Sequence, residues 1–248
     1  MRTTKWKLSV AFLVFTCLFF SKEVYSAHPL LTEDTGTQGK GGWQLEVNGE
    51  RQRDPQPATE EAPVLRATQS GTTLSYGITE TIDFKIDLPY VRHQGILDTG
   101  IGFKWRFYEE GPLSFGTLFG VFFPTGDEQK GLGTGRTNAG ALGIVSWQGE
   151  RWEFHSHAGA RSNHNTIGQR DWLGHVSAAA MYRVWQPFRA LVDVAWDSNP
   201  QADSGALRNT VVGFIWSVTK DFDLDAGIRK GNSAAVETAL LFGLTLRW

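Results

Sequence analysis

Three histidines that share one strand parity are the residues whose spacing could hold a metal ion. His155 and His157 lie two residues apart, and His175 follows a polar stretch that could reverse the chain. A hairpin centred in that stretch would bring His157 opposite His175, and imidazole is a common ligand of zinc, copper and nickel. The spacing places no third ligand, and ordinary polar lining of a lumen is the better explanation of the pattern. We therefore expect no metal and no other cofactor.

A serine hydrolase would need a serine, a histidine and a carboxylate or amide in contact. Ser177 with His175 and either Asn163 or Asp193 supplies these residue types, but their separation in the sequence does not bring them together. We expect no catalytic residues and no enzyme, and we keep a lipid hydrolase as an alternative.

Charged residues recur at every second position in several segments, with acids and bases on neighbouring segments. Asp83, Lys85 and Asp87 alternate with apolar residues, and so do Lys104 and Arg106. Such groups could select a solute by charge or brace a wall by ion pairs. The side chains expected in these roles are Asp83, Lys85, Asp87, Lys104, Arg106, His157, Arg183, Arg189 and Asp193.

The elements that must carry these groups are twelve segments of alternating polarity. Successive side chains of a β-strand point to opposite faces, so each segment is predicted to be a strand with one apolar and one polar face. Most segments have about 9–11 residues, the length that a tilted strand needs to cross a membrane. The predicted strands cover 43–51, 67–77, 81–90, 100–108, 113–123, 137–147, 151–161, 172–185, 188–196, 209–219, 222–229 and 236–248.

The connections between these segments fall into two length classes. Short turns at one rim and long loops at the other are typical of outer-membrane barrels, in which the short turns face the periplasm. Aromatic residues gather near both strand ends, as expected where amphipathic rings meet lipid headgroups. The tight turns are 78–80, 109–112, 148–150, 186–187 and 220–221, and the longer stretches are 52–66, 124–136, 162–171 and 197–208.

The sequence therefore predicts an all-β fold, a closed antiparallel transmembrane β-barrel of about 12 strands with short periplasmic turns and longer extracellular loops. Closure removes the unpaired strand edges that lipid could not satisfy. A soluble β-sandwich would also alternate, but it gives no reason for two length classes of connection.

The first residues predict export across a membrane. Three basic residues precede an apolar run over 8–20, and small residues suitable for cleavage precede Ala27. This is the pattern of a secretory signal peptide, and the run is too short for a membrane helix. Its removal would also remove the single cysteine, Cys17, and move the formal net charge from −2 to about −5, because four basic residues and one acid are lost. The expected parts are a signal peptide at 1–26, a periplasmic or lumen segment at 27–42 and the barrel at 43–248.

Small and apolar residues interrupt the polar parity on the fifth and sixth predicted strands. Leu118, Gly120, Phe122 and Leu142 stand where the barrel pattern places the lumen. Such a wall suits a partly apolar solute. Twelve strands lie between the roughly eight that leave an interior filled by side chains and the roughly sixteen that leave an aqueous channel, so we expect a narrow passage.

The most distinctive stretch of the chain runs over 27–49 and reads AHPLLTEDTGTQGKGGWQLEVNG. Together with LSYGIT at 74–79 and DFKIDLPY at 83–90, it resembles the outer-membrane family labelled putative MetA-pathway of phenol degradation. The resemblance covers essentially the whole chain after residue 26. It implies a β-barrel that passes aromatic or other hydrophobic compounds, and it supplies no catalytic residues.

These patterns predict an outer-membrane channel for the passive passage of small solutes, with aromatic or other hydrophobic compounds as candidates. The expected partners are outer-membrane lipid, a small-molecule solute and the barrel assembly machinery, which would recognise the C-terminal Trp248. No basic run points to nucleic acid. Two alternatives stay open, an outer-membrane lipid hydrolase and a non-conducting surface or scaffold barrel with a plugged lumen that binds partners through 52–66 or 197–208.

Overall fold

The computed structural model describes residues 28–52, 69–232 and 238–248 of this 248-residue chain. Within these ranges, none of the helical structure has the length and apolar character that crossing a membrane would need. The predicted signal peptide at 1–26 and nearly all of the predicted loop at 52–66 lie outside the described residues.

The described residues form strands whose bounds follow the sequence periodicity closely. They are β1 (Trp43–Gln52), β2 (Gln69–Gly77), β3 (Ile82–Val91), β4 (Gly95–Ile96), β5 (Thr99–Glu110), β6 (Leu113–Phe123), β7 (Asn138–Gln148), β8 (Trp152–Ser162), β9 (Trp172–Trp185), β10 (Phe188–Asp197), β11 (Leu207–Ser217), β12 (Phe222–Gly231) and β13 (Ala239–Arg247), with a 3-10 turn η1 (Glu128–Lys130) between β6 and β7.

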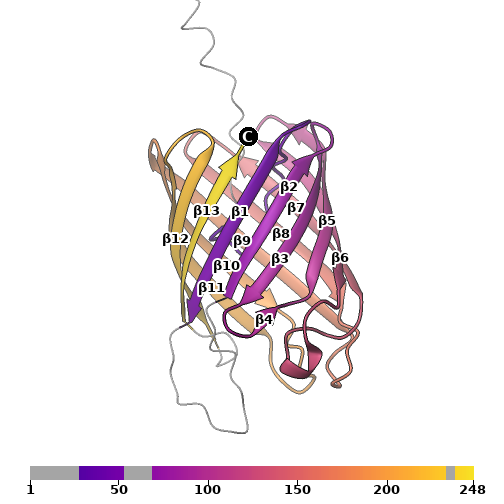
Figure 1. Cartoon of the computed structure of the whole chain (residues 1–248). Coiled ribbons are helices and arrows are strands. Elements are labelled where there is room, and N and C mark those ends of the chain that lie inside the picture. Colours follow the sequence, from indigo (N-terminus) through magenta and orange to yellow (C-terminus); the bar gives the residue numbers. More distant parts are fainter. Residues whose placement is uncertain (1–27, 53–68, 233–237) are drawn as a thin grey trace, which may run out of the picture.

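Twelve of these strands close into one antiparallel barrel (Figure 1). Each pairs with its neighbours along the chain, and β1 closes the wall by pairing with β13. At this seam the backbones of Trp43 and Trp248 exchange hydrogen bonds of 2.9 and 3.1 Å. Closure leaves the wall without an unpaired edge, which lipid could not satisfy. The predicted fold class is confirmed.

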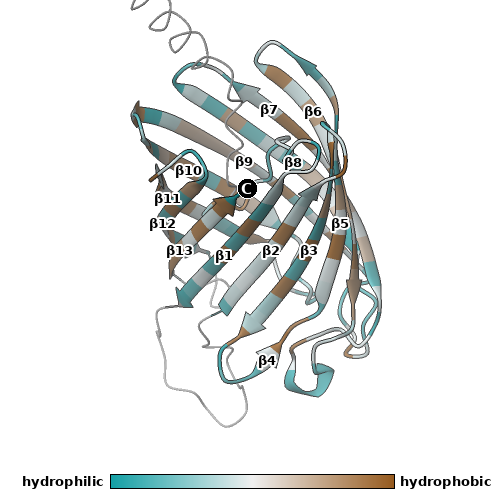
Figure 2. Ribbon diagram, turned by 45° about the horizontal axis from the view of Figure 1, so that its top comes forward, coloured by the Kyte–Doolittle hydropathy of each residue, from teal (hydrophilic) through white to brown (hydrophobic). Residues whose placement is uncertain are grey.

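The two faces of the wall differ in polarity, as Figure 2 shows by the alternating colours along each strand. On β8, Trp152 and Phe154 are 48% and 47% exposed on the outer face, whereas His155 and His157 are 2% and 4% exposed inside. A strand between hydrocarbon and a polar interior requires this sorting, because lipid cannot hydrate a charged or polar side chain.

Exposed aromatic side chains stand at both ends of the outer face. They occupy positions next to the rims, where rings with a polar edge are favoured at the membrane–water boundary. Near the short turns they are Phe107, Trp147, Trp152, Trp185, Trp216 and Trp248, and near the long loops Tyr90, Phe123, Trp172 and Trp196.

The connections separate by length between the two rims. Turns of two to four residues join β2 to β3, β5 to β6, β7 to β8, β9 to β10 and β11 to β12, and the C-terminus lies at the same end of the barrel (Figure 1). The connections β6–β7, β8–β9 and β10–β11 have nine to fourteen residues and lie at the opposite end. The predicted division into a short-turn rim and a long-loop rim is therefore present.

Three local features depart from the predicted strands. The two-residue β4 pairs with the end of β3 and was not predicted. Strand β11 runs over Leu207–Ser217 rather than 209–219, because Thr219 N–H donates to the Phe222 carbonyl and closes a turn. A β-bulge shifts the β5–β6 register between Arg106 and Tyr108, so that Phe107 and Tyr108 are both exposed.

Candidate functional site

Residues 28–42, which we call the N-terminal segment, lie inside the barrel before β1 begins. This stretch lacks alternation and is rich in threonine, glycine and acidic residues, so it has no apolar face with which to join the wall. Its backbone N–H groups must find partners in the lumen. The inward side chains of the wall supply these partners.

Asp193 of β10 is the most heavily used of these partners. Its carboxylate accepts hydrogen bonds from the backbone N–H of Leu31 at 2.6 Å and of Thr32 at 2.8 Å. It also accepts from the Thr32 hydroxyl at 2.9 Å, and that hydroxyl lies 2.8 Å from Ser177 Oγ on β9. Because Asp193 is fully buried, these donors replace the water that the carboxylate has lost.

Glu33 is bound by cations from two strands. Lys85 Nζ of β3 donates to one carboxylate oxygen at 3.0 Å, and Lys104 Nζ of β5 lies 2.9 Å from the other. Burial on its own would raise the pKa of the Glu33 carboxyl, but the charges of Lys104 and Lys85 outweigh it and hold the pKa well below its usual range. The Glu33 backbone N–H donates to Nδ1 of His157 at 2.8 Å.

The second half of the segment is bound by hydroxyls and one more carboxylate. The Thr35 hydroxyl lies 2.6 Å from Ser114 Oγ, and the Thr35 N–H donates to Ser146 Oγ at 3.1 Å. The Gln38 N–H donates to both oxygens of Asp83 at 3.0 and 3.1 Å. The segment therefore contacts the wall around most of its circumference.

Glycines on the inward parity make room for the start of the segment. Gly213 and Gly227 are register partners on β11 and β12. A Cβ atom would lie 3.1 Å from a ring carbon of Pro29 at Gly213 and 3.4 Å from it at Gly227. Larger residues at these positions would occupy the space that Pro29 fills, and close backbone approach is a common use of glycine in a strand.

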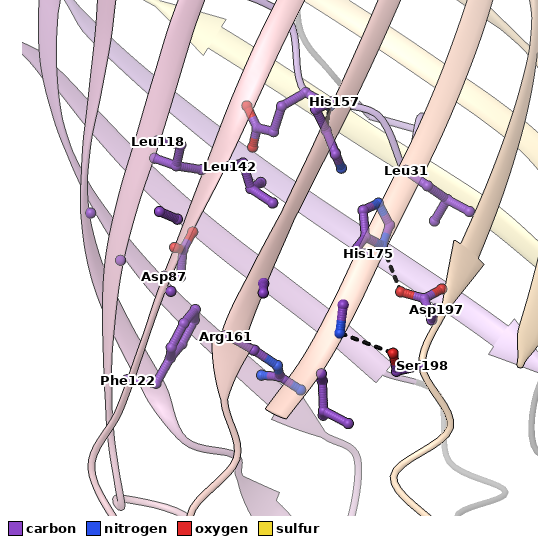
Figure 3. A pocket seen from close by; sticks show the side chains of 18 of the residues that line it. Leu31, Asp87, Leu118, Phe122, Leu142, His157, Arg161, His175, Asp197 and Ser198 are labelled. Carbon is purple, nitrogen blue, oxygen red and sulfur yellow. Dashed lines mark hydrogen bonds and ion pairs between the residues drawn. The ribbon is translucent and has the colours of Figure 1, made fainter. Parts of the chain in front are cut away.

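The segment divides the lumen into two unequal parts. Toward the short-turn rim, the space beside Glu33, Lys85 and Lys104 is a cavity of only about 20 Å³. Toward the long-loop rim lies a cavity of about 510 Å³, which we call the vestibule (Figure 3). Its labelled lining residues are Leu31, Asp87, Leu118, Phe122, Leu142, His157, Arg161, His175, Asp197 and Ser198.

The two histidines singled out by spacing meet at the floor of the vestibule. The rings of His157 and His175 are 4.5 Å apart, but they are diagonal neighbours, because the register partner of His157 is Ser177. Nδ1 of His175 lies 2.5 Å from the Asp197 carboxylate. Among the residues that the structure describes, no group of three or more histidine, cysteine or acidic side chains could hold a metal ion.

The residues considered for hydrolase chemistry serve other contacts. Ser177 and Asp193 both bind Thr32 under the N-terminal segment. The Asn163 amide donates to the Arg170 carbonyl at 2.9 Å within the β8–β9 loop. These groups therefore hold the segment and a loop in place.

The nine charged and polar side chains predicted for the lumen all come from the inward parity, but they fall into four places. Asp83, Lys85, Lys104, His157 and Asp193 contact the N-terminal segment. The other four lie elsewhere: Asp87 lines the vestibule and accepts from the Thr73 hydroxyl at 2.7 Å, Arg106 lies 3.3 Å from Glu109 near a short turn, and Arg183 and Arg189 lie 3.8 and 4.0 Å from Glu153.

The sequence predicted a periplasmic or lumen segment at 27–42, but it did not single out the side chains of that segment that contact the wall. Thr32, Glu33, Thr35 and Gln38 had no alternating pattern to mark them, and Arg161 was not singled out although it has the inward parity. The signal that could have found the segment was the set of inward glycines, among them Gly213, Gly227 and Gly243. A lumen that holds only water does not need glycine to make space.

A closed twelve-stranded barrel with an apolar belt, two aromatic girdles and a polar lumen has the architecture of outer-membrane barrels of the porin type. The chain belongs to the family described as "Putative MetA-pathway of phenol degradation", whose model matches residues 29–248. No curated protein matches the sequence.

Several solved structures share the fold at low sequence identity. An outer membrane channel from Pseudomonas putida F1 gives a TM-score of 0.66 at 13% identity, covering 87% of this chain and 98% of that chain. The KdgM and NanC porins each give 0.61, at 6% and 10% identity, covering 82% of this chain and 98% of theirs. Similarity at this level shows the architecture and does not identify a solute.

Proposed function

We propose that this protein is an outer-membrane channel for small, partly apolar solutes, aromatic compounds among them, which enter through the vestibule. The observation that carries the proposal is the vestibule itself. Its volume of about 510 Å³ lies within the roughly 300–1,000 Å³ typical of small-molecule sites. The fold and the family membership support the same class of function.

The lining of the vestibule explains the preference for a partly apolar solute. Leu118 and Phe122 from β6 face it together with Leu142 from β7 and Leu173 from β9. Gly120 and Gly140 lie between them, so part of the wall carries no side chain. Apolar surface of this kind favours a solute that loses water on entry, whereas Asp87 and Ser198 can hydrogen-bond a polar substituent.

Exit toward the short-turn rim requires the N-terminal segment to move or to leave a path beside it. The segment is held by hydrogen bonds and ion pairs and, at its start, by Leu30 and Leu31, which pack against inward apolar residues of the wall. The polar contacts are individually worth about 0.5–3 kcal/mol, and they can open without unfolding the barrel. In this proposal the long-loop rim faces outside the cell, and the short-turn rim faces the periplasm.

The test is uptake by liposomes that contain the purified protein. We expect faster entry of phenol-sized aromatic solutes than of sugars of similar mass. Leu118→Glu and Leu142→Glu should slow aromatic entry, because each places a charge in the apolar part of the vestibule. Phe119→Leu, on the exposed outer face of the same strand, is the matched control. The proposal would be wrong if aromatic solutes and sugars entered at the same rate and neither Leu118→Glu nor Leu142→Glu changed that rate.

A non-conducting surface or scaffold barrel is the second candidate, and one observation favours it. The pocket that Glu33 lines with Lys85 and Lys104 on the short-turn side of the N-terminal segment has a volume of only about 20 Å³. A scaffold predicts bilayers that remain electrically silent for the intact protein and also for a variant whose segment has been released, such as Asp193→Ala. Discrete conductance in the released variant would decide for the channel.

Assembly into the membrane is part of the same proposal. Trp248 is 61% exposed at the short-turn rim, and its ring stacks on that of Trp43 at 6.2 Å across the seam. We expect the assembly machinery to recognise this C-terminal strand before the seam closes. Trp248→Ala should lower the amount of folded protein in the outer membrane, whereas Trp172→Ala at the other rim should lower it less.

A further inference from the structure

Basic side chains break the apolar pattern of the outer face in one sector of the long-loop rim. Arg208 on β11 and Lys230 on β12 have the outward parity, because their neighbours Asn209 and Arg229 belong to the inward set. Both side chains are exposed. Arg51 has the same parity near the end of β1, two strands from β12 in the wall. Together they place three cations on adjoining parts of the surface that faces lipid.

A surface groove of about 540 Å³ connects two of these cations with an apolar floor. Arg208 and Lys230 line it near the rim, and Val212 and Ile228, which are register partners, line it deeper in the wall. Val212 and Ile228 are 59% and 54% exposed. Four residues of strand separate Arg208 from Val212, which corresponds to about 13 Å along the strand. The groove therefore runs from a cationic end to an apolar end over the depth of a lipid headgroup region and the first part of its chains.

Within residues 28–52, 69–232 and 238–248, no carboxylate is in ion-pair contact with the Arg208 or Lys230 side chain. The register partners on this face are Trp196 beside Arg208 and Thr210 beside Lys230. On other strands, the outward positions nearest the same rim are aromatic, as at Tyr90 and Phe123. A positive charge on the lipid face is costly at the bilayer midplane but costs little near the interface, so cations at the rim lie at the depth where anionic headgroups can meet them.

We propose that this groove binds a phosphorylated glycolipid of the outer leaflet, with phosphate between Arg208 and Lys230 and an acyl chain along Val212 and Ile228. A guanidinium binds two phosphate oxygens at once, and an ammonium adds a point charge. The long-loop rim faces the outer leaflet of a Gram-negative outer membrane, whose lipid anchor carries phosphates on a sugar backbone. The inference rests on that orientation and is independent of which solute passes through the lumen.

The test measures lipid binding to purified full-length protein in a neutral detergent, by native mass spectrometry. The probes are bisphosphorylated lipid A, the same lipid without phosphate, phosphatidylglycerol and inorganic phosphate. We expect bisphosphorylated lipid A to bind, and Arg208→Gln with Lys230→Gln to weaken it about 10–30-fold. Lys220→Gln, at the exposed short-turn rim, is the matched control and should bind normally. Raised salt should weaken the native complex and affect the double variant less.

The other arms can overturn the proposal without any variant. Equal binding of the phosphate-free lipid would show that the cations do not recognise phosphate. If phosphatidylglycerol bound as tightly as lipid A, the groove would be a general phospholipid site. If inorganic phosphate at the same concentration displaced lipid A completely, the acyl chain would contribute nothing to binding. Should the double variant fail to fold, Arg208→Gln alone should still weaken lipid A binding. Solute uptake through the vestibule is measured separately, so failure of one proposal leaves the other standing.

Discussion

The two halves of the lumen have the same wall and opposite contents. Toward the short turns, inward carboxylates, lysines and hydroxyls are bound to the N-terminal segment, and about 20 Å³ remains free beside Glu33. Toward the long loops, leucines, glycines and Phe122 surround a cavity of about 510 Å³. The polar half therefore holds a piece of the chain, whose Leu30 and Leu31 also pack on apolar residues of the wall, whereas the half toward the long loops contains an open cavity with a largely apolar lining.

The largest expected effect comes from removing the acceptor that the segment uses most. Asp193→Ala leaves the N–H groups of Leu31 and Thr32 and the Thr32 hydroxyl without their carboxylate. Each buried donor left unpaired costs about 1–3 kcal/mol, so the segment should leave its place for much of the time. We expect single-channel conductance to rise several-fold in planar bilayers. Asp193→Asn, which keeps one acceptor oxygen, should give a conductance between those of wild type and Asp193→Ala. An Asp193→Ala protein that conducts no more than wild type would contradict the account.

A smaller effect is expected from the cations that hold Glu33. Replacing Lys85 and Lys104 together by methionine leaves the Glu33 carboxylate buried without a counter-charge. An unpaired buried charge is strongly destabilising, whereas a neutral polar group costs less. Conductance should therefore rise in the double variant, and Glu33→Gln added to it should return conductance part of the way to wild type. Failure of this rescue would show that the lysines act on something other than Glu33.

The inward glycine at 227 offers a test confined to the start of the segment. Gly227→Ala places a methyl group 3.4 Å from the Pro29 ring and 3.2 Å from the Val212 carbonyl, so small shifts are needed. We expect a modest increase in open time, below twofold. Gly111→Ala is not a suitable control, because Gly111 lies in a short turn with a φ of +57°. Gly71→Ala is the better control, because a Cβ atom at that position would have no neighbour within 4 Å. If Gly227→Ala and wild type had the same open time, Gly227 would not be needed to seat the start of the segment.

The smallest effect is an acid response. Because the folded-state pKa of Glu33 lies below its ordinary value of 4.5, the ionised carboxylate stabilises the seated segment at all pH values above about 4.5. That contribution is lost as the pH falls below 4.5 toward the folded pKa. Conductance measured from pH 7 to pH 3 should rise only in the acid part of this range, and Glu33→Gln should abolish that rise. A Glu33-dependent rise centred near neutral pH would contradict the assignment.

The strands and the side that each residue faces could be predicted from the sequence because a period of two depends only on local geometry. Ile82, Phe84 and Ile86 alternate with Asp83 and Lys85 in the sequence, and they do so in β3. The ends were less certain, as β11 shows, because a turn hydrogen bond rather than a change in polarity ends that strand.

The contents of the lumen could not be predicted in the same way. Leu31 and Asp193 are separated by 162 residues, and Glu33 and His157 by 124. No local pattern encodes such contacts, because they arise only after the wall has closed. The sequence placed the right charges inside and suggested that they pair with one another across the wall. In the structure such pairs join Arg247 with Asp223 and Arg229 with Glu50. The charges first considered for such pairing have other partners, since Lys104 meets Glu33 and Asp34, and Asp83 meets the backbone of Gln38.

The central claim, that the N-terminal segment closes a channel whose vestibule is open to the long-loop side, can be tested with a reversible cross-link. Thr32→Cys and Ser177→Cys replace side-chain oxygens that lie 2.8 Å apart, so a small side-chain movement would bring the two sulfurs to the roughly 2.05 Å of a disulfide bond. Outside the predicted signal peptide the chain contains no other cysteine, so the pair is unambiguous. We predict that oxidation reduces both conductance and entry of aromatic solutes to the background of empty liposomes, and that reduction restores both. An oxidised protein that passes ions and solutes as well as the reduced one would contradict the account.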